Sequence, residues 1–339
     1  MTMGFIALNA QEIDFVEYDL DNGLHVILHQ DNRAPVITTS VQYHVGSKNE
    51  EVGRSGFAHF FEHLLFEGTK NIGSGEWFKI VEANGGSNNA YTTDDSTYYY
   101  EVFPSNKLEL SLWMESERML HPIIRQTDRI DLQEGVVKEE KNFRYRNAPY
   151  GGLLYAVRSQ LYKVHPYGRL TIGLDKDLEA ANIDDFIKFN SLYHKPNNAT
   201  LVVAGDIDYE ETKKLIKKYF DDIPSSSLDK NELPSEDLIT ETRRSTWYDP
   251  NVQVPALLVG YITPKMNTRE SRVLNLLSTY LSGGKSSVLY KKMVDNKKIA
   301  LAVQAINLAQ EDYGTYLMLA IPIGEVTIDT VSYTHLTLP

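Results

Sequence analysis

The chain has 339 residues, of which 42% are hydrophobic, and its 46 acidic and 34 basic residues give a formal net charge of -12. This length and composition suffice for a real hydrophobic core and favour two domains. The acidic balance argues against nucleic-acid binding as the main function, because neutralising phosphates requires a basic surface. The absence of cysteine excludes disulfides and thiolate ligands, so a metal site would need histidine and carboxylate ligands.

The start of the chain bears on the compartment. Residues 1–11 resemble the end of a secretory signal, because small residues follow a short apolar piece, but they lack a basic start and a full apolar region. This favours the bacterial periplasm or secretion, with a disordered terminus and a cytoplasmic location as the alternatives. No apolar run is long enough to span a bilayer, so we expect no transmembrane segment.

Strand and helix patterns alternate along residues 14–224, which we expect to form the first domain. In its first two strands His25, His29 and His44 alternate with β-branched neighbours, so we interpret them as strand-face residues rather than metal ligands. The expected strands are 24–29, 36–45, 88–102 and 199–205, and the expected helices are 56–67, 76–83, 107–120, 128–146, 153–162, 183–193 and 210–220.

A polar segment at 225–239, with three consecutive serines and a proline, is interpreted as an interdomain linker. Residues 240–339 then follow a similar order of elements and are expected to form a second, related domain. Its expected strands are 254–261, 300–306 and 313–321, and its expected helices are 269–281 and 286–294. These patterns predict an α+β fold built from two related units.

The stretch GFAHFFEHLLFEGT at 56–69 places two histidines within an apolar helix pattern. His59 and His63, four residues apart, share one helix face, and Glu62 lies beside them. This H-x-x-E-H order brings a carboxylate within reach of a water on a metal that both imidazoles bind. The alternative is a chance pattern with hydrogen-bonded rings, but burying three such groups among phenylalanine and leucine is costly unless they bind something.

Two later segments contribute further candidates. In the helix at 128–146, Gln133 and Glu140 share one stripe, and because Glu139 is adjacent to Glu140, only one of these two glutamates can face inward with it. The strand at 88–102 is rich in threonine and tyrosine. Its spacing favours an ordinary antiparallel strand, and the alternative is a sheet edge that pairs with a peptide backbone.

With these residues in view, the chain resembles the pitrilysin-type zinc peptidases of family M16, the inverzincins, in which H-x-x-E-H inverts the usual motif order. Members of that family carry a third ligand, a glutamate, and 76 residues separate His63 from Glu140 here, which matches their spacing. The family-like segments, in family order, are GFAHFFEHLLFEGT, NNAYTTDDSTYYYEV, VVKEEKNFRYRNAPYG, NATLVVAGDID and LSGGKSSVLYKKM. The resemblance covers about residues 15–325 and is strongest to the shorter bacterial members.

The resemblance implies a fold and a partner. It implies two sequential α/β-roll domains with mixed sheets flanked by helices, of which the second is incomplete and carries an atypical tail from residue 331. Family members work inside a chamber that a second, similar half closes, either fused or as a separate subunit. We therefore expect a partner half, in a homodimer or a heterodimer, besides a peptide substrate.

The resemblance also assigns the site. It implies one zinc ion per chain, and two imidazoles with one carboxylate leave an open coordination position for catalysis. The residues that match the family's site are the metal ligands His59, His63 and Glu140, the general base Glu62, and the substrate-binding Asn89 and Ala90. One position departs from the pattern, because Gln133 stands where many members have a further glutamate. Its amide can hydrogen-bond around the ligands but brings no charge, which can alter metal affinity or pH dependence.

Together these features predict a zinc-dependent endopeptidase that hydrolyses peptides or small unfolded polypeptides. The alternative is a non-catalytic peptide-binding or assembly subunit of the same fold that needs a partner half. S-ribosylhomocysteine lyase also carries an H-x-x-E-H motif, but it requires cysteine, and this chain has none.

Overall fold

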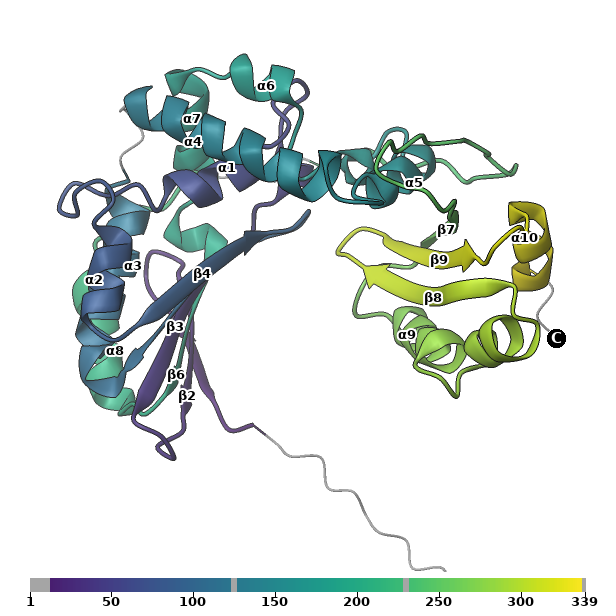
Figure 1. The fold of residues 1–339 in the computed structure, drawn as a ribbon. Coiled ribbons are helices and arrows are strands. Elements are labelled where there is room, and N and C mark those ends of the chain that lie inside the picture. Colours follow the sequence, from purple (N-terminus) through teal and green to yellow (C-terminus); the bar gives the residue numbers. More distant parts are fainter. Residues whose placement is uncertain (1–12, 123–126, 228–231, 337–339) are drawn as a thin grey trace, which may run out of the picture.

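The structure, a computed structural model, describes residues 13–122, 127–227 and 232–336. Figure 1 shows a larger domain built on one sheet, a smaller domain built on a second sheet, and the helix α5 (Leu153–Leu161) between them. The mixed α/β architecture confirms the predicted fold class. The expected division at 225–239 has no helix or strand among its described residues, 225–227 and 232–239.

The larger domain has a six-stranded sheet in the order β1-β2-β6-β3-β5-β4. Its strands are β1 (Val16–Asp19), β2 (His25–Gln30), β3 (Val36–Tyr43), β4 (Ser87–Thr92), β5 (Thr97–Pro104) and β6 (Ala199–Gly205). The pair β2 and β6 is parallel and the other pairs are antiparallel, so this sheet is mixed. Strand β4 is an edge strand, which matters for the site.

Helices cover one face of this sheet, the face turned toward α2, α3 and α8 in Figure 1. The helices of this domain are α1 (Phe57–Leu64), α2 (Trp77–Ala83), α3 (Leu108–Leu120), α4 (Thr127–Lys141), α5, α6 (Asp175–Glu179), α7 (Ile183–Tyr193) and α8 (Tyr209–Phe220). Strand side chains alternate accordingly, and Val26 and Leu28 are buried in the core whereas His25 and His29 are on the other face, as expected from their pattern.

The smaller domain has an antiparallel three-stranded sheet in the order β7-β9-β8. Its elements are β7 (Leu257–Thr263), α9 (Arg269–Ser282), a π-helical segment (Tyr290–Asn296), β8 (Ala300–Ala309), β9 (Gly314–Pro322) and α10 (Ile328–Leu336). This order repeats β3-β5-β4 of the larger sheet, and α1 and α9 each follow the first strand of their set. The repeat supports the expectation of two related units.

Several elements differ from the sequence prediction. The segment predicted as one strand at 88–102 is a hairpin, because the polar residues 93–96 form a tight turn between β4 and β5. The helix expected at 128–146 ends at Lys141 and continues as a π-helical segment, Asn142–Arg146. The short helices α6 and α10 were not anticipated; α10 covers part of the tail expected from residue 331, whose last residues, 337–339, lie outside the described part.

The two domains share a small apolar cluster. Its buried members are Leu161 at the end of α5 and Tyr162 and Tyr167 in the segment that follows, and they pack with Ile262 of β7 and Tyr313 before β9. The Tyr162 hydroxyl also hydrogen-bonds the Gly314 carbonyl at 2.9 Å. The two sheets are therefore joined through packed side chains, and not only through the chain at 225–239.

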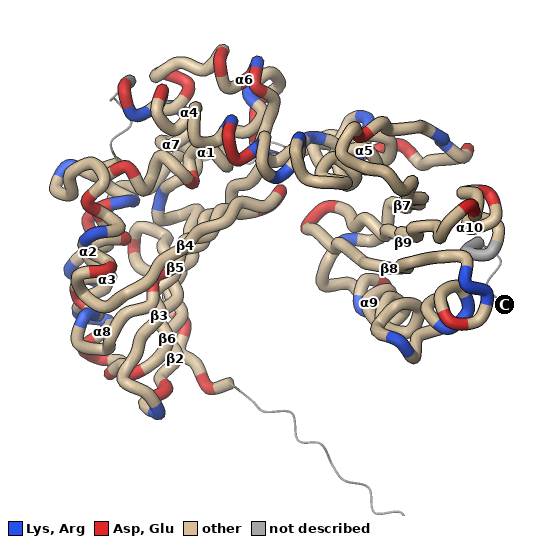
Figure 2. Tube along the Cα trace, viewed as in Figure 1, with Lys and Arg blue, Asp and Glu red and all other residues tan. Residues whose placement is uncertain are grey.

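Basic and acidic residues are interspersed along the helices in Figure 2 rather than gathered by sign. Within the described ranges, none of the helices is long and apolar enough to cross a membrane.

A buried arginine holds the helix layer against the sheet. Arg118 of α3 is fully buried and lies 3.2 Å from the carboxylate of Glu115 and 3.7 Å from that of Glu101 in β5. Its guanidinium also lies 4.5, 4.1 and 4.2 Å from the ring centroids of Phe66, Trp77 and Tyr99. Cation–π contacts and ion pairs thus connect the segment after α1, α2 and the sheet at one point.

We predict that Arg118→Met destabilises the protein by about 3–5 kcal/mol, because it leaves two buried carboxylates without their cation. Lys218→Met is the matched control, since Lys218 pairs with Glu109 at 2.7 Å on the exposed surface and such pairs add little. Urea unfolding followed by circular dichroism measures both. Equal midpoints for the two variants would contradict the assigned role of Arg118.

Candidate metal centre and active site

The two motif histidines lie on α1, which runs among buried aromatic side chains. The residues Phe57, Phe60 and Phe61 anchor the helix in the core. The opposite face carries His59 and His63, whose ring centroids are 4.8 Å apart. Because their spacing is one helical turn, the same sequence pattern that buries the helix also brings the two imidazoles together.

The first turn of α1 is fixed by a buried carboxylate. Glu50 accepts hydrogen bonds from the backbone N–H groups of Gly56 and Ala58, both at 3.0 Å. These donors have no partner within the helix, and a carboxylate near them is favoured by the helix dipole. Burial raises the pKa of Glu50, and the two backbone donors oppose that shift.

The third candidate ligand comes from α4. Glu140 Oε2 lies 3.4 Å from His59 Nε2 and 3.2 Å from His63 Nε2. The second carboxylate oxygen, Oε1, forms an ion pair of 3.0 Å with the guanidinium of Arg144, one turn further along the chain in the π-helical segment. Of the two adjacent glutamates, Glu140 faces the histidines whereas Glu139 is exposed.

One loop holds α1 and α4 together. Gly173 and Gly56 both have left-handed backbones, with φ of +82° and +92°, and they lie so close that a Cβ on Gly173 would be 2.5 Å from Gly56 Cα. The ammonium of Lys141, the residue after Glu140, donates to the Gly173 carbonyl at 2.7 Å and to Asp175 at 2.7 Å. The loop around Gly173 therefore touches the start of the histidine helix and the end of the glutamate helix.

The three groups suit zinc. Zinc binds imidazole nitrogen and carboxylate oxygen at about 2.0–2.2 Å, so that ligand atoms in tetrahedral positions are about 3.3 Å apart. The two distances from Glu140 have this size, and candidate ligand atoms of His59, His63 and Glu140 all lie within 4.8 Å of one another. Burial and the neighbouring His63 lower the pKa of His59 to about 4, so its imidazole is neutral and available as a ligand at pH 7.

Glu62 also lies at this centre. Its carboxylate accepts a hydrogen bond of 2.6 Å from the hydroxyl of Thr92, the last residue of β4. Burial raises the pKa of Glu62 above its usual range, and the Thr92 hydroxyl opposes the shift. A carboxylate with a raised pKa is suited to accepting and returning a proton near neutral pH.

Strand β4, whose last residue Thr92 bonds Glu62, forms one edge of the sheet. It pairs with β5 on one side only, and its outer edge has no neighbouring strand in the described sheet. Ala90 packs toward the core, whereas Asn89 is exposed and its side-chain oxygen accepts from the Ala90 N–H at 2.9 Å. Both residues lie on the strand that ends at Thr92, and their contact with a substrate stays a prediction.

Gln133 lies two turns before Glu140 on α4. Its amide donates to the carboxylate of Glu67, which lies three residues after the end of α1. Arg129 lies 3.7 Å from the same carboxylate. Gln133 therefore joins α4 to the end of the histidine helix at a second point. A direct influence of Gln133 on the ligands stays a prediction.

Sequence reasoning missed the residues that position the ligands. The missed residues are Glu50, Gly56, Thr92, Lys141 and Gly173. Glycine before the apolar helix is a recognisable signal for a tight helix start. Glu50 lies six and eight residues before its partners Gly56 and Ala58, outside the helix that it caps. The partners of Thr92, Lys141 and Gly173 lie 30 or more residues away, and no local pattern connects them.

We predict that Gly173→Ala destabilises the protein and weakens zinc binding, because the added Cβ would collide with Ser55 O and Gly56 Cα. Gly53→Ala is the control, since Gly53 has a φ of +81° and open space around it. The left-handed backbone alone costs about 1–2 kcal/mol, so Gly173→Ala must cost more than that. Unfolding curves and zinc competition with a chelator measure both variants; zinc affinities that are equal in the two would contradict the role of the loop.

The chain matches two protein-family descriptions. Residues 25–173 match the family described as Insulinase (Peptidase family M16), and residues 180–331 match the Peptidase M16 inactive domain. The histidine helix and Glu140 lie in the first match, and the three-stranded sheet lies in the second.

Several similar proteins come from bacteria. The zinc protease PqqE of Helicobacter pylori (strain ATCC 700392 / 26695) is 34% identical over 306 residues, which cover 89% of this chain and 68% of that protein. The crystal structure of a protease from Helicobacter pylori has a TM-score of 0.86 and 31% identity, and the match covers 96% of this chain and 79% of that one. The periplasmic protease PqqL from Escherichia coli shares the fold, with a TM-score of 0.77 and 23% identity over 93% of this chain and 36% of that one. The matched domains and the similarity along most of its length show that the chain belongs to peptidase family M16, among the shorter bacterial members of the pitrilysin type.

Proposed function

We propose that the protein is a zinc-dependent endopeptidase that hydrolyses peptides or small unfolded polypeptides. The observation that carries this proposal is the convergence of His59, His63 and Glu140, with the carboxylate of Glu62 beside them. Two imidazoles and one carboxylate form the open ligand set of catalytic rather than structural zinc sites. One zinc ion per chain is expected.

When bound, zinc supplies a Lewis acid that polarises the scissile carbonyl and favours ionisation of water. Glu62 accepts the proton of the attacking water through its carboxylate and returns it to the leaving amine. Burial raises the pKa of the Glu62 carboxyl group, which favours its accepting and returning a proton. The Thr92 hydroxyl orients that carboxylate, and Arg144 orients Glu140.

The open edge of β4 suits the main chain of an extended peptide. A peptide that pairs with this edge would add a strand beside Asn89 and Ala90, close to Glu62. Main-chain hydrogen bonds then give affinity for extended segments of varied sequence, which peptides and unfolded polypeptides readily present. This geometry supports peptides and unfolded polypeptides as the substrate class.

A second peptidase-like half is the proposed partner, in a homodimer or a heterodimer. The support is that the chain matches 36% of PqqL and 72% of a structure described as the first half of that protein. The alternative function is a non-catalytic peptide-binding or assembly subunit of the same fold. It is favoured by the match of residues 180–331 to an inactive domain, although the complete ligand set lies in the other match.

The bacterial periplasm or the extracellular space is the proposed location. It is supported by the signal-like residues at the start of the chain and by the description of PqqL as periplasmic. The cytoplasm is the alternative. Cell fractionation with antibody detection distinguishes these compartments.

Glu140→Ala is predicted to lower zinc affinity at least about 100-fold, since even residues outside the ligand set change affinity by about 10–100-fold. Glu139→Ala is the matched control, because the adjacent carboxylate is exposed and points away from the histidines. Competition with a fluorescent zinc chelator measures both affinities. Zinc binding that survives in Glu140→Ala, or is lost equally in Glu139→Ala, would contradict the ligand assignment.

Glu62→Gln is expected to bind one zinc ion per chain and to lose about 10²–10⁴-fold in cleavage rate, because the isosteric amide cannot accept the proton. Metal content by mass spectrometry and cleavage of a mixed peptide library measure the two properties. His63→Ala should fold but lose zinc. A wild-type chain that binds zinc and cleaves nothing, alone or with an added second half, would favour the non-catalytic alternative.

A further inference from the structure

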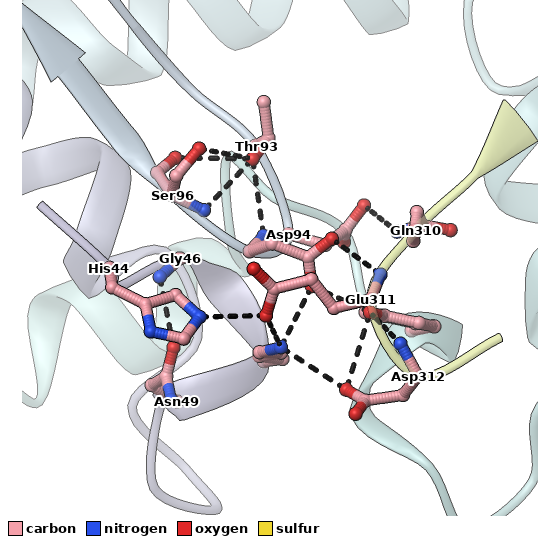
Figure 3. Close-up of polar contacts among 12 residues, drawn as sticks. His44, Gly46, Asn49, Thr93, Asp94, Ser96, Gln310, Glu311 and Asp312 are labelled. Carbon is pink, nitrogen blue, oxygen red and sulfur yellow. Dashed lines mark hydrogen bonds and ion pairs between the residues drawn. The ribbon is translucent and has the colours of Figure 1, made fainter. Parts of the chain in front are cut away.

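The turn between β4 and β5 lies against the tip of the β8–β9 hairpin of the smaller domain. Figure 3 shows Gln310, Glu311 and Asp312 of this tip facing Asp94 and His44 of the larger domain. The turn itself is tightly hydrogen-bonded, since the Thr93 N–H donates to the Ser96 carbonyl at 2.8 Å. The two domains therefore meet at the end of the edge strand that borders the proposed active site.

The hairpin tip bonds two buried carboxylates of that turn. The Gln310 amide donates to Asp94 Oδ2 at 2.6 Å, and the Glu311 backbone N–H donates to Asp95 Oδ2 at 3.1 Å. Asp94 and Asp95 are each only 8% exposed. Buried carboxylates are strongly destabilised without partners, so these donors constrain where the turn can lie.

The larger domain supplies the remaining partners of the same two carboxylates. Asp94 Oδ1 accepts from Arg158 at 2.8 Å and from the Ser47 hydroxyl at 2.9 Å. Asp95 Oδ1 accepts from the Tyr167 hydroxyl at 2.6 Å. Each carboxylate thus has one oxygen held by the larger domain and the other held by the hairpin tip, so that the turn is fixed from both sides.

A buried lysine strengthens the contact. Lys48 Nζ lies 3.0 Å from Asp95, 2.6 Å from Glu311 and 3.2 Å from Asp312, and it thereby joins the turn to the hairpin. His44 Nε2 lies 2.7 Å from Glu311. The bond with His44 and the ammonium of Lys48 lower the pKa of Glu311 to about 2, so this carboxylate is ionised at neutral pH.

The contact at Asp94 is two residues away from Thr92, the hydrogen-bond partner of the proposed general base Glu62. Thr92, which donates to Glu62, is the last residue of β4 and directly precedes the turn. A shift of the turn moves Thr92 along with it, because only Thr93 separates Thr92 from Asp94. The helices of His59, His63 and Glu140 are in addition held by a different segment, the loop at Gly173.

We propose that the β8–β9 hairpin tip of the smaller domain positions the end of β4, and that Gln310 thereby sets the orientation of Thr92 and Glu62 for catalysis. Gln310 is then a positioning residue, which acts through Asp94 and Thr92. The smaller domain completes the site without contributing a metal ligand. The catalytic consequence rests on the proposed peptidase function, whereas the mechanical coupling does not.

The coupling is tested by hydrogen exchange of the full chain without substrate. Gln310→Ala should speed amide exchange in β4 and its turn, residues 87–96, by about tenfold, since a hydrogen bond to a charged group is lost. Asn307→Ala is the matched control, because Asn307 lies in β8 three residues before Gln310 and its amide donates to Ser271 and Asn275 of α9. Unchanged exchange at 87–96 in Gln310→Ala, or equal acceleration in both variants, would overturn the proposal.

The catalytic role is tested by a double-mutant cycle with Thr92→Val on cleavage of a model peptide. If Gln310 acts through Thr92, then Gln310→Ala lowers kcat about tenfold with little change in KM or zinc affinity, and it has no further effect in the Thr92→Val background. Equal losses in both backgrounds would show a merely structural role and overturn the catalytic part.

These two experiments separate the possible failures. A wild-type chain that does not cleave peptides would refute the proposed function, and the exchange experiment would still decide the coupling. A wild-type chain that cleaves peptides, with no effect of Gln310→Ala on either kcat or exchange, would refute the inference alone.

Discussion

The contact between two left-handed glycines, Gly56 and Gly173, is the constraint on which the candidate site depends. The histidines and the third ligand lie on separate helices. To bind one metal ion, their ligand atoms must be placed with a precision of a few tenths of an ångström. Neither helix alone can ensure this. The loop at Gly173 fixes the start of α1 by direct packing and the end of α4 through Lys141, so that a single element sets the distance between the two helices.

The smaller domain also contacts the segment that leads to the candidate site. It lies within the match to the Peptidase M16 inactive domain, and its strand order repeats that of β3-β5-β4 in the larger sheet. Its hairpin nevertheless contacts the turn that follows Thr92, the hydrogen-bond partner of the proposed general base Glu62. We therefore propose that this repeat supports the site by holding the end of an edge strand.

The local elements could be predicted from the sequence, whereas the contacts between them could not. Apolar periodicity located α1 and α4. Helical spacing showed that only one of Glu139 and Glu140 can face inward, and the family's spacing from His63 then identified Glu140. The hairpin turn at 93–96 was missed, because threonine and tyrosine on both sides of it look like one strand. Thr92, Lys141 and Gly173 could not be assigned, since their partners are between 30 and more than 100 residues away or in another helix.

The central claim is that His59, His63 and Glu140 together hold zinc. X-ray absorption spectroscopy of the zinc-loaded chain tests it most directly, because the fine structure counts imidazole ligands. We predict four-coordinate zinc with two imidazole nitrogens and oxygen in the remaining positions, at about 2.0–2.2 Å. A spectrum with one or three imidazoles would contradict it, and so would a spectrum that Glu140→Ala leaves unchanged.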